Sequence, residues 1–218
     1  MIYVNGRFLL QSLTGVNRFA YELCRAWVQM GIPFILCCPS GSIKGCYDVS
    51  HFNIVVYGWG KSHVWEQLLL PLWFSRIKGE KVLVCFTGLG PLLIRKKIMT
   101  IHDLAFMANP DWYSRSYRLW YRLMTPLCVA TSMKILTVSE FSKSEIVRRL
   151  SIDDRKISVI YNAVSSLFCV SDSSHRNARE VTGEKYILAV SSIDPRKNFS
   201  MLLKAFAQMD DKNIKLYI

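Results

Sequence analysis

Short apolar runs alternate along the chain with longer segments in which apolar residues recur every three or four positions. The short runs are bounded by glycine, proline or polar residues and predict buried β-strands, at 1–4, 34–38, 54–57, 82–86, 98–101, 134–138 and 157–160. The longer segments predict amphipathic helices, at 19–30, 63–77, 114–128 and 139–150. Strands that are apolar throughout and alternate with helices predict an α/β fold with a doubly wound parallel sheet, covered on both faces.

Two of the predicted helices carry further signals. Pro71 lies inside 63–77 and should kink or break that helix, because proline lacks a backbone N–H and its ring clashes with the preceding turn. In the last helix, Ser142 and Glu145 have the spacing of a capping box, whereas Ser139 offers a cap one turn earlier. The sequence therefore leaves two possible starts for this helix, one turn apart.

The character of the sequence changes after Asn162. Residues 165–184 are rich in Ser, Arg and Asp and lack periodicity, which indicates a linker or a mobile loop. Residues 185–218 then predict one strand–helix–strand unit, too small to bury a core of its own. We therefore expect a Rossmann-like domain over 1–164, a linker over 165–184 and an incomplete second Rossmann-like domain over 185–218.

Composition and charge limit the classes of function. The chain is 51% hydrophobic and 20% charged, which excludes a disordered tail. No apolar run approaches the roughly 18 residues that span a bilayer, and no secretory signal pattern is present; we expect a soluble chain on the cytoplasmic side. The net charge of +12 is concentrated in residues 61–160, which hold sixteen basic and eight acidic residues. This excess indicates an anionic partner: lipid headgroups, a phosphorylated substrate or nucleic acid.

The seven cysteines are interpreted as reduced residues rather than a disulfide framework. No CxxC pair and no histidine at metal-ligand spacing from a cysteine occurs, so no metal site is expected. Five cysteines lie in apolar or helical segments and two in polar surroundings; they are Cys24, Cys37, Cys38, Cys85 and Cys128, followed by Cys46 and Cys169.

Aromatic residues and arginines are interleaved over 112–122. Such a mixture suits a membrane interface, and it also suits stacking on single-stranded nucleic acid, although no base-reading motif accompanies it. The third interpretation is an ordinary amphipathic helix with rings inward and arginines outward. Arg115, Arg118 and Arg122 recur at three- and four-residue spacing, which predicts one solvated basic face.

Five motifs appear in a fixed order over almost the whole chain, at residues 14–23 (TGVNRFAYEL), 101–104 (IHDL), 136–145 (LTVSEFSKSE), 159–163 (VIYNA) and 190–198 (VSSIDPRKN). In this order they resemble the retaining, nucleotide-sugar-dependent glycosyltransferases of family 4, mannosyltransferase-like members included, which have the GT-B fold. The resemblance implies that residues 1–164 are the acceptor-side domain. It implies that residues 185–218 begin the domain that binds the nucleotide sugar.

The motifs in the first domain supply most of the candidate site residues. His102 directly follows a predicted strand, at the carboxyl end of the sheet where open α/β folds bind ligands, and the resemblance implies that it contacts the donor sugar. Asp103 either fixes the tautomer of His102 or orients the loop. The resemblance implies that Gly15, just before a helix whose N–H groups favour anions, lies near the donor diphosphate. Arg18 and Ser139 complete the expected cleft on the acceptor side.

The second domain contributes two basic residues. Arg196 and Lys197 precede a helix that Asn198 or Ser200 caps, and two cations there are unfavourable unless an anion is present. The resemblance implies that this anion is the donor diphosphate. Many family members carry a Gly-Arg pair where this chain has Ser-Ser at 191–192, and the family's Glu-x7-Glu segment lies beyond residue 218.

The resemblance implies transfer of a sugar from a GDP- or UDP-sugar donor to a growing cell-surface polysaccharide or lipid-linked glycan. It implies no cofactor and no metal, and we expect no nucleic-acid partner. The chain is expected in the cytoplasm, peripheral on the inner face of the membrane if it binds anionic lipid. Because half of the expected cleft is absent, we expect poor donor binding and slow or no transfer. The alternative is a catalytically silent basic module that docks on an anionic membrane or polyanion.

Overall fold

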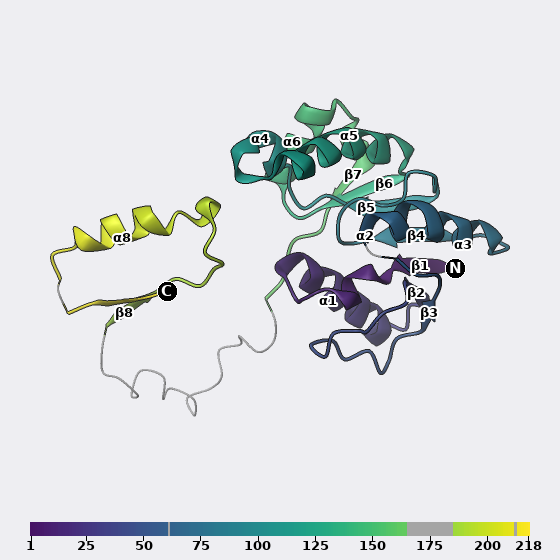
Figure 1. Ribbon diagram of the computed structural model, residues 1–218, viewed down its shortest axis with the longest axis horizontal. Helices are drawn as coiled ribbons and strands as arrows, with labels where there is room; N and C mark the ends of the chain where they lie inside the picture. The colour runs from purple at the N-terminus through teal and green to yellow at the C-terminus, as the bar shows by residue number, and fades with distance from the viewer. Residues whose placement is uncertain (61, 165–184, 212) are drawn as a thin grey trace. The chain divides into compact units, whose positions relative to one another are not determined.

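In the computed structural model, which describes residues 1–60, 62–164, 185–211 and 213–218, the chain divides into two units, Met1–Asn162 and Ala163–Ile218 (Figure 1). Each unit is described by itself. The linker predicted at 165–184, and Cys169 within it, lie outside the described residues.

Seven parallel strands form the sheet of the first unit in the order β3-β2-β1-β4-β5-β6-β7. Their bounds are β1 (Ile2–Asn5), β2 (Phe34–Cys38), β3 (Ile54–Val56), β4 (Val82–Cys85), β5 (Lys97–Thr100), β6 (Lys134–Thr137) and β7 (Ile157–Val159). The strand order reverses between β1 and β4, where Tyr3 pairs with Leu83. The sheet confirms the predicted doubly wound α/β fold.

Helices connect these strands and cover both faces of the sheet. They are η1 (Gly6–Leu10), α1 (Gly15–Gln29), α2 (Ser62–Val64), η2 (Trp65–Leu69), α3 (Leu70–Arg76), α4 (Ala105–Ala108), η3 (Pro110–Trp112), α5 (Arg115–Thr131), α6 (Glu140–Leu150) and η4 (Asp154–Lys156). Figure 1 shows α1 on one side of the sheet and α4, α5 and α6 on the other.

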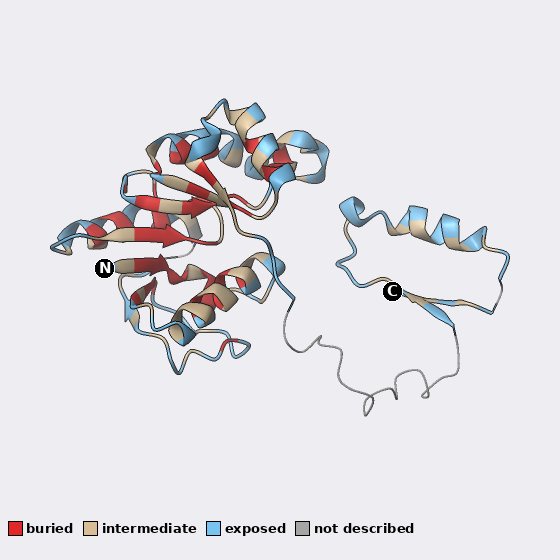
Figure 2. Ribbon diagram, turned by 180° about the vertical axis from the view of Figure 1, so that it is seen from behind, coloured by how far each residue is buried: buried red, intermediate tan, exposed pale blue. Residues whose placement is uncertain are grey.

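Alternation along the strands divides the buried side chains into two cores. Tyr3 and Leu83 lie in the core covered by α3, α5 and α6, whereas their chain neighbours Val4 and Val84 lie in the core covered by η1 and α1. In the first unit, the residues in Figure 2 coloured as buried follow the sheet and the inner sides of the helices. Both faces of the central strands are therefore withdrawn from water, as apolar parallel strands require.

Pro71 is accommodated without ending the helical path. The segment changes to a π-helical turn, η2, in which the Leu70 N–H reaches back to the carbonyl of Trp65. Pro71 then lies in the first turn of α3, where a missing N–H leaves no intrahelical bond unmade. The predicted kink is thus a π turn that ends two residues before the proline.

Ser139, and not Ser142, caps α6. Its Oγ accepts a hydrogen bond from the Ser142 N–H at 3.1 Å. The capping box predicted from Ser142 and Glu145 is wrong, because Glu145 lies within the helix and binds Arg148 and Arg149 one turn later.

The second unit contains β8 (Tyr186–Leu188), η7 (Pro195–Lys197), α8 (Phe199–Ala207) and β9 (Lys215–Tyr217), with β8 and β9 parallel. No residue of 185–211 or 213–218 is buried within it. One strand–helix–strand unit presents too little apolar surface to enclose a core.

Five cysteines are buried, and burial raises the pKa of each thiol; they are Cys24, Cys37, Cys38, Cys85 and Cys128. Their burial agrees with the interpretation of these five as small apolar residues, whereas Cys46 is exposed. Of the helices in the described part of the chain, none has the length and apolar character that crossing a membrane requires.

Candidate active site

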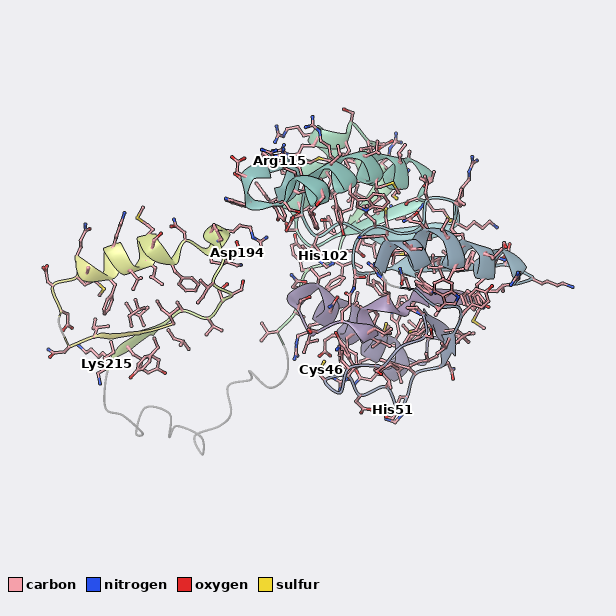
Figure 3. All side chains as sticks on the ribbon, in the orientation of Figure 1. Cys46, His51, His102, Arg115, Asp194 and Lys215 are labelled. Carbon is pink, nitrogen blue, oxygen red and sulfur yellow. The ribbon has the colours of Figure 1, made fainter. Side chains whose placement is uncertain are left out.

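The loops that follow β1, β4, β5 and β6 meet at the carboxyl edge of the sheet, because the strands are parallel. His102 lies two residues after β5, and Phe86 directly follows the neighbouring β4. Figure 3 shows His102 between α1 and the helices that follow β5 and β6. The sequence-based placement of this histidine at the carboxyl edge agrees with the structure.

The ring of His102 is held on two sides. Nε2 lies 2.9 Å from the carbonyl oxygen of Phe86, and the ring meets that of Phe19, from α1, edge to face at a centroid distance of 5.0 Å. The backbone is held as well, since Ser142 Oγ donates to the His102 carbonyl at 3.0 Å. Helices α1 and α6 therefore both contribute to positioning this one side chain.

The same contacts determine what His102 offers to a ligand. A carbonyl oxygen only accepts hydrogen bonds, so Nε2 carries the proton and Nδ1 of the neutral ring is an acceptor. Burial lowers the pKa of His102, opposed by the Phe86 hydrogen bond and by the charge of Asp103. A neutral ring at pH 7 can accept a hydrogen bond from a hydroxyl group at Nδ1 without carrying a charge.

Asp103 and Ser139 organise the loop around His102 rather than its ring. Asp103 Oδ1 accepts from the Ala105 N–H at 3.0 Å and so fixes the start of α4. Asp103 was expected either to fix the tautomer of His102 or to orient the loop. The Phe86 carbonyl determines the tautomer, and Asp103 orients the loop. Ser139 Oγ is engaged with both the N–H and the Oγ of Ser142.

Gly15 is the first residue of α1, which Thr14 caps by accepting from the Asn17 N–H at 3.3 Å. A Cβ added at Gly15 would meet no atom within 4 Å, so the backbone there is open to a ligand. Arg18, one turn later, is exposed and pairs with Glu22 at 3.5 Å.

A buried carboxylate near the carboxyl end of β1 was missed in the sequence. Glu66, in η2, is 1% exposed, and its Oε1 accepts from Asn5 Nδ2 at 2.6 Å. Its Oε2 lies 3.5 Å from Arg7 Nη2 and 3.6 Å from His63 Nδ1. The Arg7 side chain is only 11% exposed. These residues form a buried charge cluster beside the point where the strand order reverses.

Two signals point to this cluster. Glu66 is the only acidic residue between 62 and 79, in an otherwise apolar segment, and a lone carboxylate in such a setting is rarely buried without a cationic partner. The helical path also forms its π turn at this residue, and π turns are frequent at functional sites. The identity of its partners, however, depends on β1 lying beside η2 in the fold.

The aromatic residues of 112–122 divide between two environments. Tyr113, Tyr117 and Tyr121 stack along α5, with centroid distances of 5.2 and 4.2 Å, and the ring of Trp120 lies 5.5 Å from that of His63. Trp112 is exposed. The outer face of α5 carries leucines instead, Leu119, Leu123 and Leu127, of which the first two are more than 60% exposed. Arg115 and Arg122 are exposed and Arg118 is half-buried.

The basic turn of the second unit, at Arg196 and Lys197, contains a carboxylate of its own. Asp194 Oδ1 accepts from the N–H and from Nε of Arg196, which lowers the pKa of Asp194. Asn198, with a φ of 50°, caps α8. Lys197 is exposed. The Asp194 carboxylate thus supplies part of the negative charge that a pair of cations at this helix start requires.

Within the described residues, no three His, Cys, Asp or Glu side chains lie together so that they could hold a metal ion. The expectation that no metal takes part stays a prediction.

A family model described as Glycosyltransferase Family 4 matches residues 13–166. Over 126 residues the chain is 32% identical to the O-antigen chain mannosyltransferase RfbU of Salmonella typhimurium, covering 58% of this chain and 33% of that protein. Over 125 residues it is 26% identical to O-antigen chain mannosyltransferase B of Escherichia coli, covering 53% and 32%. The chain therefore matches about a third of the length of these curated relatives.

Among solved structures, the fold is similar to that of WaaG, a glycosyltransferase involved in lipopolysaccharide biosynthesis. The TM-score is 0.63, the sequence identity is 13%, and the match covers 99% of this chain and 62% of that one. At this identity the likeness concerns the fold alone.

Proposed function

The chain belongs to Glycosyltransferase Family 4 and has the fold of the N-terminal part of a GT-B glycosyltransferase, and from this we propose that it serves a retaining sugar transfer from a nucleotide-diphosphate donor. The acceptor is a growing cell-surface polysaccharide or a lipid-linked glycan. The names of the two curated relatives support a hexose, with mannose the first to test.

The observation that carries this function is the position of His102. Its ring lies at the carboxyl edge of the sheet, neutral, with Nε2 engaged by Phe86 and Nδ1 left as an acceptor. We assign Nδ1 to a hydroxyl of the donor sugar, which it orients during transfer. An acceptor held in advance by α1 and α6 loses little conformational freedom when the substrate binds.

Within the first unit, the donor diphosphate is assigned to Gly15 at the start of α1. The open backbone at Gly15 exposes the N–H groups and the positive end of the α1 dipole, which favour phosphate oxygens. In the second unit, the basic side chains of Lys197 and Arg196 at η7 are of the kind that bind phosphate oxygens through charge-assisted hydrogen bonds. With these donors the leaving diphosphate is stabilised without a metal or other cofactor.

In the transfer step the bond between the sugar C1 and the diphosphate oxygen breaks. The bond between C1 and the acceptor hydroxyl oxygen forms on the same face, so the anomeric configuration is retained. The acceptor proton passes to the leaving phosphate oxygen. Arg18 and Ser139 lie on the acceptor side, and the reaction takes place at the cytoplasmic face of the membrane.

The test is the release of nucleoside diphosphate when the 218-residue chain is incubated with GDP-mannose and a panel of UDP-sugars. We expect slow release that falls at least tenfold in His102→Ala, because the sugar loses its orienting acceptor. His51→Ala, which alters an exposed histidine elsewhere, is the matched control and should keep the original rate. Equal rates in the wild type and His102→Ala would contradict the proposal.

A second candidate function is a silent module that docks on an anionic membrane, and the outer face of α5 favours it. Three exposed leucines there lie on the same helix as the exposed Arg115 and Arg122. Apolar side chains beside cations are suited to the headgroup layer. Co-sedimentation with phosphatidylglycerol vesicles that is lost in Leu123→Glu and at high salt, without nucleotide release, would favour this function over transfer.

A further inference from the structure

A concave site lies at the amino edge of the sheet, opposite to the edge that carries His102. It is a cavity of about 700 Å³ between α3 and the segment that enters β5. Lys81 directly precedes β4, and Arg95 and Lys96 directly precede β5, which places the cavity at the amino ends of these strands. Its volume falls within the roughly 300–1,000 Å³ of small-molecule sites.

The cavity is apolar in both its floor and its walls. Pro71, Phe74 and Ile94 are buried and form the floor. Leucines form the walls although they face water: Leu68 is 62% exposed and Leu93 75% exposed. Leu68 and Leu72 are one helical turn apart, so η2 and α3 present them on one side. Leucines gathered around a cavity on the surface indicate an apolar ligand.

Cations line the rim of the same cavity. Arg95 and Lys96 are exposed, and within the described residues neither forms an ion pair with a carboxylate. Lys81 differs, because its ammonium group donates to the carbonyls of Phe74 and Ile77 and so caps the end of α3. Arg95 and Lys96 are therefore available to an anion outside the chain, and Lys81 adds positive charge at the base of the rim.

The loop that carries the rim is held in place from two sides. Gln67 of η2 donates to the Gly90 carbonyl at 3.2 Å and accepts from the Leu92 N–H at 2.9 Å. Cys128 of α5 also donates to the Gly90 carbonyl. The position of the cations relative to the leucines is thus fixed by the fold before any ligand binds.

From these observations we propose that the cavity binds an anionic membrane lipid, with part of an acyl chain between Leu68, Leu72 and Leu93 and the phosphate on Arg95 and Lys96. An amphiphile matches both halves of the site. A sugar or nucleotide would leave its polar groups against leucine, and a neutral apolar ligand would leave the two cations without a partner. Because the site lies at the edge opposite to His102, lipid binding here is independent of sugar transfer.

The test uses decyl phosphate below its critical micelle concentration, titrated calorimetrically into the 218-residue chain. Octyl phosphate should bind about 15-fold more weakly, because each buried methylene changes affinity about fourfold. Inorganic phosphate should show no measurable binding, and decyl maltoside, which has the chain without the charge, should bind more weakly than decyl phosphate.

Variants assign the binding to the cavity. Leu68→Glu should reduce the affinity for decyl phosphate at least tenfold, because it places a carboxylate in the apolar wall. Leu188→Glu is the matched control, since Leu188 is equally exposed but does not line the cavity and lies on β8; it should leave the affinity unchanged. In the double variant Arg95→Gln, Lys96→Gln, the affinity for decyl phosphate should fall about fivefold for each cation removed. The affinity for decyl maltoside, which carries no charge, should stay unchanged.

Three results would overturn the assignment. Leu68→Glu and Leu188→Glu weakening the binding equally would show a general apolar surface. Inorganic phosphate binding as tightly as decyl phosphate would show a phosphate site without a lipid. A dimer in sedimentation that Leu68→Glu dissociates, with no decyl phosphate binding, would show that a second copy of the chain covers the cavity. A failure of this kind leaves the His102 test untouched, because that test measures nucleotide release.

Discussion

Replacing Glu66 by Gln tests whether the buried charge cluster stabilises the fold. Gln keeps the size of the side chain and an oxygen that accepts from Asn5, but it removes the charge that faces Arg7 and His63. The guanidinium of Arg7, 11% exposed, then remains largely withdrawn from water without its carboxylate. Removing one partner of a buried pair costs about 3–5 kcal/mol, and the retained Asn5 bond places the expected loss near the lower end, at about 3 kcal/mol.

Glu22 provides the matched control. It also faces two basic side chains, Arg18 at 3.5 Å and Arg25 at 3.1 Å, but its own side chain is 40% exposed on α1. Exposed pairs contribute about 0–1 kcal/mol, so Glu22→Gln should cost less than about 1 kcal/mol. Both variants are compared with the wild type in the free energy of unfolding by urea at pH 7. Equal losses for the two variants would refute the assignment of a buried charge cluster to Glu66.

Three further predictions concern the site and its supports. Gly6→Ala should lower the free energy of unfolding by urea by about 1–3 kcal/mol, because a Cβ there would lie 2.5 Å from Cys38 Sγ. Gly15→Ala, whose Cβ would have no atom within 4 Å, should change it by less than about 0.5 kcal/mol. The reverse order would contradict the packing described. Ser139→Ala should cost about 1 kcal/mol through loss of the α6 cap, and an unchanged urea midpoint would exclude that role. Because the pKa of His102 is lowered in the folded chain, the unfolded chain binds a proton at this histidine more readily as pH falls below 6.5. The free energy of unfolding should therefore decrease with falling pH. His102→Gln should remove the part of that decrease that comes from this residue.

The sheet was predictable because its signal is local. Runs such as 34–38 and 82–86 are apolar at successive positions, and only a strand covered on both faces buries every side chain of such a run. The position of His102 followed from the same reasoning, since a residue directly after a parallel strand lies at the carboxyl edge.

The features that were missed depend on segments far apart in the sequence. The tautomer of His102 is determined by the Phe86 carbonyl, from a different strand. Two partners of Glu66, Asn5 and Arg7, lie at the end of β1 and just after it, far earlier in the chain. Ser139 and not Ser142 caps α6, and Ser142 Oγ instead donates to the His102 carbonyl. Local patterns contain no information on such pairings.

The most direct test of the central claim observes the imidazole nitrogens of His102 by long-range proton–nitrogen NMR while GDP-mannose or a UDP-sugar is added. We expect the resonance of Nδ1 to move as it accepts a hydrogen bond from the sugar, with Nε2 still protonated and the exposed His51 unchanged. Resonances of His102 that stay fixed across the donor panel up to millimolar concentrations would contradict a role in binding the donor sugar.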